Sequence, residues 1–243
     1  MKGTTPSGTA SEQEASRWVR SMFGRIAPRY DLANHVLSLN LDRFWRAYTV
    51  KCVRPILRRP GARVLDICCG TGDLMLALQA ESTEPAMGSD FCRPMLSGAQ
   101  RKIEARGLHC PLFESDALRL PLADQSLDLI TVAFGFRNFA NYEEGLAEIY
   151  RVLKPSGAAA ILEFSHPGKT AFGALYTFYS RHVLPIIGGL LSGSRDAYSY
   201  LPASIGKFPS AEDLARDMRG AGFRTVEFKH MTGGVVALHI GTK

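Results

Sequence analysis

The chain has 243 residues, of which 46% are hydrophobic and 21% are charged, and this composition suits one globular domain with a sizeable core. Its net charge of +6 permits attraction to an anionic membrane surface. The Lys and Arg residues are scattered, however, without a basic stripe or an RNA-binding signature, which argues against nucleic acid as a partner. The sequence also lacks the run of about 18 uncharged apolar residues that a membrane-spanning helix needs.

The first residues and the cysteines indicate where the chain works. Segment 1–16 is rich in Thr, Ser, Gly and Glu and lacks the apolar core of a signal peptide, so we expect a disordered tail there. The five cysteines lack zinc-binding spacing, since Cys68 and Cys69 are adjacent and no second close pair exists. Reduced thiols of this kind favour a cytoplasmic protein, with residues 17–243 forming a single domain.

Helices dominate the first part of that domain. Apolar residues recur at helical spacing over residues 17–27, and Pro28 ends this amphipathic helix. Further helical stretches follow from Leu32 and around Trp45. Residues 17–60 are therefore predicted to form a helical cap that precedes the first strand.

Short apolar runs then alternate with helices. We expect strands at residues 63–67, 86–90, 111–114, 127–133 and 158–164, and helices at 73–79, from about Pro94, and at 143–153. This alternation predicts an α/β fold with a doubly wound, mostly parallel sheet.

The C-terminal part has a different pattern. A helix at residues 211–220 precedes two strands at 223–229 and 235–240, which the Gly233-Gly234 turn joins. Strands with so short a connection must pair antiparallel. A mostly parallel sheet closed by such a hairpin is the outline of a class I S-adenosylmethionine-dependent methyltransferase rather than of a dinucleotide-binding domain.

The loop after the first strand carries the main evidence for a ligand. Gly70 and Gly72 let the backbone approach a molecule above the end of the sheet. A dinucleotide site would have a small residue three positions after Gly72, where this chain has Met75. S-adenosylmethionine has no phosphate, but its ammonium and sulfonium cations favour nearby carboxylates such as Asp66 or Asp73. The loop therefore predicts an S-adenosylmethionine site.

Two further acids follow strands at places where a nucleoside needs them. Asp90 ends the second strand, twenty residues after Gly70, and suits a carboxylate that accepts both ribose hydroxyls. Asp116 and Ala117 follow the third strand, where the acid can accept the adenine amino group and a backbone N–H can reach the ring. The alternatives are a helix N-cap for Asp90 and a turn acid for Asp116.

From about Phe23 to Lys243, the chain resembles the ubiquinone/menaquinone-biosynthesis C-methyltransferase family. The most specific matching segments are FGFRN at residues 134–138 and TGGVVALH at residues 232–239. The resemblance implies methyl transfer from S-adenosylmethionine to a ring carbon of a polyprenyl benzoquinol or naphthoquinol. The residues that it assigns to the cofactor are Thr71, Asp90, Asp116 and Ala117.

Two local features refine the resemblance. The Cys68-Cys69 loop and the C-terminal Gly241-Thr242-Lys243 look more like the demethylmenaquinone members of the family. The family often has Ser before the FG of the FGxRN segment, whereas this chain has Ala133, so a cofactor hydrogen bond from that serine is lost.

A quinol carbon becomes nucleophilic when a ring hydroxyl loses its proton, so the site must stabilise a phenolate. Our hypothesis is that Arg137 does so, that Asn138 orients the ring or a water molecule, and that Tyr30 contacts the same oxygen. The alternative is that Arg137 pairs with an acid and Asn138 caps the next helix. Glu163 is a candidate for either a site residue or a support, and His182 and His239 are weaker candidates for the base.

Residues 166–206 are an insertion, and its apolar stretch 171–191 is predicted to be a lid. That lid would receive the prenyl tail or touch the inner face of the membrane; the alternative is a helix packed on the sheet. A homodimer and the choice of quinol ring are left open. So are another small or lipid acceptor, a noncatalytic S-adenosylmethionine-binding module and, least favoured, a nicotinamide-dependent oxidoreductase.

Overall fold

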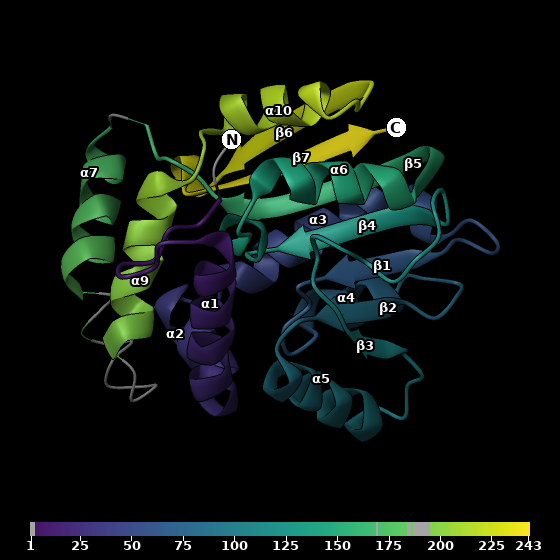
Figure 1. Ribbon diagram of the computed structural model, residues 1–243, viewed down its shortest axis with the longest axis horizontal. Helices are drawn as coiled ribbons and strands as arrows, with labels where there is room; N and C mark the ends of the chain where they lie inside the picture. Colours follow the sequence, from purple (N-terminus) through teal and green to yellow (C-terminus); the bar gives the residue numbers. More distant parts are fainter. Residues whose placement is uncertain (1–2, 169, 184–185, 187–194) are drawn as a thin grey trace.

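The computed structural model describes residues 3–168, 170–183, 186 and 195–243, and its centre is a seven-stranded sheet in the order β3-β2-β1-β4-β5-β7-β6 (Figure 1). The strands are β1 (Val64–Ile67), β2 (Met87–Asp90), β3 (Leu112–Glu114), β4 (Leu127–Ala133), β5 (Leu153–Phe164), β6 (Thr225–Met231) and β7 (Val236–Thr242). Strands β1 to β5 run parallel, and β7 is antiparallel to both β5 and β6. The predicted fold class, including the terminal hairpin, is confirmed.

Helices cover both faces of this sheet. They are α1 (Glu12–Ile26), α2 (Tyr30–Leu37), α3 (Leu41–Leu57), α4 (Asp73–Gln79), α5 (Arg93–Ala105), α6 (Tyr142–Val152), α7 (Ala171–Phe178), α9 (Arg195–Lys207) and α10 (Ala211–Gly220). Val64 and Leu129 face α3 and α4, whereas their neighbours Leu65 and Ile130 face α6 and α10. Because the central strands β1 and β4 are covered on both faces, they are mostly apolar along their length rather than alternating.

A third apolar cluster forms the cap at one end of the sheet. Val19 and Met22 of α1 pack with Leu37 of α2, Met95 of α5 and Tyr200 of α9. The arrowheads of β1 and β4 point toward α1, α2 and α9, so the cap stands over the carboxyl ends of the parallel strands (Figure 1). Ligands of open α/β sheets bind at that end.

The expected disordered tail at residues 1–16 is wrong for the part that is described, residues 3–16. Helix α1 begins at Glu12, and the Ser11 side chain caps it by accepting a hydrogen bond from the N–H of Glu14. Thr4 is buried, and its N–H donates to the carbonyl of Phe139 at 2.7 Å. The polar composition concealed a Ser-x-x-Glu helix start of the capping-box type.

The predicted lid stretch 171–191 lies only partly within the described residues, because 184–185 and 187–191 fall outside them. Within the described residues, α7 is followed by one turn of π-helix, Tyr179–Val183. No helix of the described chain combines the length and hydropathy needed to cross a bilayer.

Candidate active site

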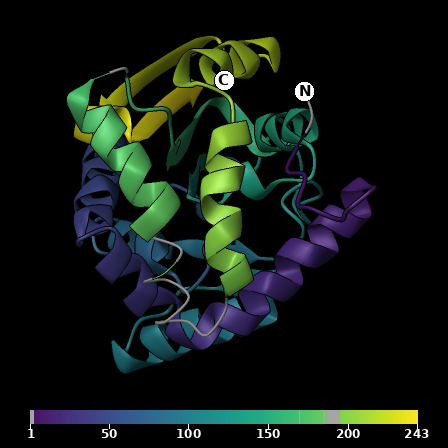
Figure 2. The same cartoon turned by 90° about the vertical axis from the view of Figure 1, so that its left-hand side faces the viewer.

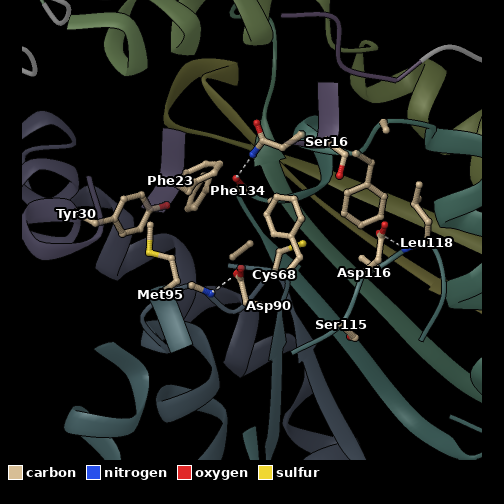
Figure 3. A pocket seen from close by; sticks show the side chains of 18 residues that line it. Ser16, Phe23, Tyr30, Cys68, Asp90, Met95, Ser115, Asp116, Leu118 and Phe134 are labelled. Carbon is tan, nitrogen blue, oxygen red and sulfur yellow. Dashed lines mark hydrogen bonds between the residues drawn. The ribbon is translucent and has the colours of Figure 1, made fainter. Parts of the chain in front are cut away.

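Two adjoining cavities lie between the strand ends and the cap, and they share Phe23, Tyr30 and Phe134 in their walls. One, the strand-end cavity, is lined by the loops after β1, β2, β3 and β4 and has a volume of about 60 Å³ (Figure 3). The other, the cap cavity, has a volume of about 450 Å³ and is lined mainly by side chains of α1, α2, α3, α7 and α9.

Asp90 is the central acid of the strand-end cavity. Its Oδ2 accepts a hydrogen bond from the N–H of Gly70 at 2.9 Å, and its Oδ1 accepts one from the N–H of Cys92 at 2.8 Å (Figure 3). Burial raises the pKa of Asp90 to about 6 despite these bonds. The carboxylate therefore fixes the glycine loop to the end of β2 while it lines the cavity.

Asp116 and Ala117 also line the strand-end cavity, with Asp116 on the side away from Tyr30 (Figure 3). Asp116 is exposed, and its Oδ1 accepts a hydrogen bond from the N–H of Leu118 at 2.9 Å. Leu118 and Met95 add apolar surface to the same cavity. A carboxylate at the rim beside apolar walls is the arrangement that an adenine ring and its amino group require.

Close backbone approach brings the loops after β1 and β4 together. A Cβ atom on Gly135 would lie 2.5 Å from the Cβ of Cys68, so only glycine fits there. Cys68 and Phe134 both adopt positive φ, at 51° and 58°, which is uncommon for residues with side chains. Burial raises the pKa of the Cys68 thiol well above its usual value, so this cysteine is a neutral wall residue.

Three predicted cofactor residues support the loop from outside the cavity lining. Asp66 is buried and accepts a hydrogen bond from the hydroxyl of Thr131 at 2.6 Å, and burial raises its pKa to about 7. The Thr71 hydroxyl donates to Asp31 at 2.5 Å. Gly72 has a φ of 83° and caps α4. Contact of these three residues with a cofactor stays a prediction.

Arg137 is buried and lines the cap cavity. Its Nη1 donates to Oε1 of Glu163 at 3.0 Å and to the carbonyl of Phe134, and its N–H donates to Oε2 of Glu163 at 3.1 Å. Burial alone would lower the pKa of Arg137, but Glu163 opposes this and holds it above the ordinary value. Arg137 is thus paired with an acid, as the alternative prediction stated. This pairing keeps the guanidinium charged and fixed at the wall of the cap cavity.

Asn138 does not cap the next helix, because the Asn141 side chain caps α6. Instead, Asn138 lines the strand-end cavity, and its Oδ1 accepts a hydrogen bond from the Tyr200 hydroxyl at 2.9 Å. The Tyr200 hydroxyl also lies 2.7 Å from the Thr4 hydroxyl. The N-terminal segment, α9 and the loop after β4 therefore meet at one hydrogen-bonded point.

Tyr30 lines both cavities, and Figure 3 shows it beside Phe23 in the wall of the strand-end cavity. Burial raises the pKa of Tyr30 above its usual value, although the charge of Arg137 and a hydrogen bond with Asn34 act in the opposite direction. The phenol is therefore neutral and can donate a hydrogen bond into either cavity. Tyr30 thus lines both cavities, whereas Arg137 lines only the cap cavity and Asn138 only the strand-end cavity, and the catalytic roles of the three residues stay a prediction.

The two candidate histidines lie elsewhere. His239 is on β7, and its Nε2 donates to the carbonyl of Ala211 at 2.8 Å, while burial lowers its pKa to about 4. His182 is exposed, with its ring centroid 5.0 Å from that of Phe178. Neither is among the described residues that line the cavities.

An ion-pair network beside the cap cavity was not predicted from the sequence. His35, Asp42 and Asp73 lie close enough to hold a metal ion. However, Arg46 already pairs with Asp42, and Lys102 lies 2.6 Å from Asp73, so cations of the chain itself neutralise these acids. The signal that could have predicted this pairing is the i,i+4 spacing of Asp42 and Arg46 on one helix.

The residues at the strand ends fit S-adenosylmethionine. Asp90 suits the ribose hydroxyls, and Asp116 suits the adenine amino group. The negative charge of these acids also favours a cationic cofactor. Ligand cavities usually measure about 300–1,000 Å³, so the strand-end cavity, at about 60 Å³, has to widen before a nucleoside can enter. When bound, the cofactor supplies an electrophilic methyl group on its sulfonium.

The strand order, the antiparallel β7 and acids at the ends of β2 and β3 together define a class I S-adenosylmethionine-dependent methyltransferase. A solved S-adenosylmethionine-dependent methyltransferase of Thermotoga maritima has the same fold, with a TM-score of 0.64 and 21% identity over 92% of this chain and 98% of that one.

The chain belongs to the ubiE/COQ5 methyltransferase family, whose model matches residues 9–243. It is 48% identical to the demethylmenaquinone methyltransferase of Thermus thermophilus, over 91% of this chain and all of that protein. It is 40% identical to the ubiquinone/menaquinone biosynthesis C-methyltransferase UbiE of Geotalea uraniireducens, over 95% of this chain and 98% of that one. The chain is therefore an S-adenosylmethionine-dependent methyltransferase, as the resemblance implied.

Proposed function

We propose that this enzyme methylates a ring carbon of a prenylated quinol, and that the quinol is demethylmenaquinol, which becomes menaquinol. The observation that carries the proposal is the cap cavity of about 450 Å³, which is mostly apolar and has the Arg137 guanidinium in its wall. An apolar ring with a hydrophobic tail matches the apolar walls, and a ring hydroxyl matches the guanidinium. The names of the related proteins point to the same acceptor class.

In the proposed reaction, the chain aligns the acceptor carbon with the methyl group in a site from which water is largely excluded. Arg137 stabilises the phenolate oxygen, because Glu163 keeps its guanidinium charged and directed. The neutral Tyr30 donates a second hydrogen bond to the same oxygen. Asn138 orients the ring or a water molecule, with its amide held by Tyr200.

The proton of the quinol hydroxyl passes to water in this scheme. Asp42 is the carboxylate in the wall of the cap cavity, and burial would raise its pKa. Hydrogen bonds from Ser38 and the charge of Arg46 outweigh burial, so the pKa of Asp42 lies below its ordinary value. A carboxylate held in its ionised form this strongly is a poor proton acceptor.

The insertion at residues 166–206 is proposed to act as the lid of the cap cavity. Phe172 and Leu175 of α7 and Leu201 of α9 line that cavity, in keeping with a role in enclosing the tail. The enzyme is proposed to work in the cytoplasm, in peripheral contact with the inner face of the membrane where a prenylated quinol resides.

The test is methyl transfer from labelled S-adenosylmethionine to reduced demethylmenaquinol and, separately, to the demethylated ubiquinol precursor, with the labelled atom located by mass spectrometry. We expect label on the naphthoquinol ring carbon. Label on the benzoquinol alone would change the acceptor. Tight cofactor binding without transfer to either quinol would overturn the quinol assignment and support another acceptor or a noncatalytic module.

A further inference from the structure

The exposed large apolar side chains of the described chain are unevenly distributed. With the exception of Leu108 and Ile186, they lie on α2, in the turn between α2 and α3, at the start of α3 and on α7. Leu39 is 77% exposed and Leu175 is 67% exposed, although both are large aliphatic residues. We call the surface formed by Leu32, Leu39, Phe44, Phe172, Leu175 and Phe178 the mouth face. Contiguous apolar surface of this kind marks an interaction site.

The two parts of the mouth face are neighbours in space. The Tyr179 hydroxyl, just after α7, donates to the carbonyl of Leu37 at the end of α2, at 3.0 Å. Helix α7 and the start of α3 lie on the same side of the molecule (Figure 2). Leu39 and Leu175 belong both to this surface and to the wall of the cap cavity. The rim of the cap cavity is therefore apolar and continuous with the exposed patch.

The acids beside the mouth face are paired with cations of the chain. Asp31 is paired with Lys102 at 2.7 Å, and Asp42 is buried and paired with Arg46. Arg43 is exposed and lies in the sequence between Leu39 and Phe44 of the mouth face, and α7 contains no charged residue. An apolar surface with an exposed cation at its edge complements anionic lipid headgroups above an acyl layer.

We propose that the mouth face docks on an anionic lipid bilayer and that the acceptor passes from the bilayer into the cap cavity without crossing water. The route rests on the proposed function, whereas the docking does not. A second copy of this chain seated on the same surface would close the rim through which a tailed acceptor must enter, and this favours the bilayer as the occupant.

The experiment uses the full chain and vesicles of equal parts phosphatidylglycerol and phosphatidylcholine, with binding measured by cosedimentation. The test variant is F44E/F178E, because both phenylalanines are more than half exposed and neither lines a cavity. The control is Leu108→Glu, which places the same charge on an exposed apolar residue outside the mouth face. We expect binding of F44E/F178E to fall at least about tenfold, binding of the control to match the parent, and binding to pure phosphatidylcholine to be weaker for the parent.

Activity is measured on two quinols, one with a short tail in solution and one with a long tail in the vesicles. F44E/F178E should lose turnover of the vesicle-bound quinol about tenfold and keep turnover of the soluble one. Equal vesicle binding by parent and F44E/F178E, or none by the parent, would overturn docking while methylation of the soluble quinol stands. Conversely, absence of methylation with intact vesicle binding would overturn the proposed function alone.

Light scattering tests whether a second copy of this chain, rather than a bilayer, covers the mouth face. If the parent is a dimer and F44E/F178E is a monomer, the mouth face is a contact between copies, and the bilayer proposal is wrong. If the parent and F44E/F178E have the same oligomeric state, the result supports docking on the bilayer.

Discussion

The strand-end cavity and the cap cavity share a wall, but they are built from different parts of the molecule. The first is made by loops at the ends of strands, held by backbone contacts such as the bond from Gly70 to Asp90 and the close approach of Gly135 to Cys68. The second is made by side chains on α1, α2, α3, α7 and α9, which pack against one another.

This difference separates two tasks. A nucleoside is recognised by a few polar groups at fixed positions, and loops between the strands of a rigid sheet provide such positions. A prenylated ring needs mainly apolar area, which helices in a cap can provide and can also uncover by moving. We therefore expect changes in one cavity to affect one substrate and to spare the other.

The largest expected effect comes from the cap cavity. Arg137→Ala should lower kcat by about 10³-fold, because it removes the charge that stabilises the phenolate. The affinity for S-adenosylmethionine should be unchanged, since Arg137 lies outside the strand-end cavity lining. Single-turnover kinetics and calorimetric cofactor titration measure the two quantities. Near-normal turnover with intact cofactor binding would lead us to withdraw the assignment.

Loss of the guanidinium also leaves Glu163 as an unpaired buried charge, which is destabilising by about 3–5 kcal/mol. The double variant R137A/E163A removes both charges and serves as the stability control. If the double variant unfolds like the parent but remains as slow as Arg137→Ala, the lost rate reflects chemistry rather than misfolding.

The second effect belongs to the strand-end cavity. Asp90→Asn should weaken cofactor binding by about 10- to 100-fold, the usual value of hydrogen bonds to a charged group, and leave single-turnover chemistry at saturation close to normal. Because the pKa of Asp90 is about 6, cofactor affinity of the parent should rise as pH increases through 6, while that of the variant stays flat. Equal pH dependence in both proteins would contradict the ribose role.

Asp66 lines neither the strand-end cavity nor the cap cavity, but it supports the glycine loop, so we expect its substitution to change stability rather than the binding of a substrate. The pKa of Asp66 in the folded chain, about 7, lies well above the ordinary pKa of an aspartate, 3.8, so the folded chain binds the proton more tightly than the unfolded chain. Its contribution to stability is therefore greatest below pH 4 and is lost as pH rises to about 7. Asp66→Asn should remove this pH dependence. As the pH rises from about 4 to about 7, the free energy of unfolding of the variant should therefore come to exceed that of the parent by on the order of a few kcal/mol.

Denaturant unfolding at several pH values measures the effect of Asp66→Asn. Cofactor affinity should stay near that of the parent. If Asp66→Asn weakens cofactor binding as strongly as Asp90→Asn does, Asp66 contacts the cofactor, and the prediction from the sequence was the better one.

The smallest expected effect concerns the hydrogen bonds that join the cap to the loop after β4. Tyr200→Phe removes the donor to Asn138 and should lower kcat about fivefold, the value of one ordinary hydrogen bond. Thr4→Val is the matched control, because it removes the neighbouring hydroxyl and leaves the bond between Tyr200 and Asn138. Steady-state rates with both substrates saturating should therefore show a smaller decrease for Thr4→Val.

The same division explains what the sequence could predict. Strands, the terminal hairpin and the acids Asp90 and Asp116 follow from local patterns, because residues at the ends of parallel strands must meet at one edge of the sheet. The pairing of Arg137 with Glu163 joins the turn after β4 to β5, and the contact of Thr4 with Tyr200 joins residues 196 positions apart. Such contacts leave no periodic signal, and for this reason the tail was misjudged and the cap cavity was not foreseen.

The position of Glu163 also has a consequence for the synthesis of the protein chain on the ribosome. It lies on β5, between β4 and β7, and pairs with Ala237 of β7. A ribosome produces the N-terminal strands first, so β5 is an edge strand, with unpaired peptide groups, until β7 has been synthesised and has docked. The carboxylate of Glu163, which directs Arg137, therefore lies on a strand that completes its pairing only when β7, synthesised after it, is in place.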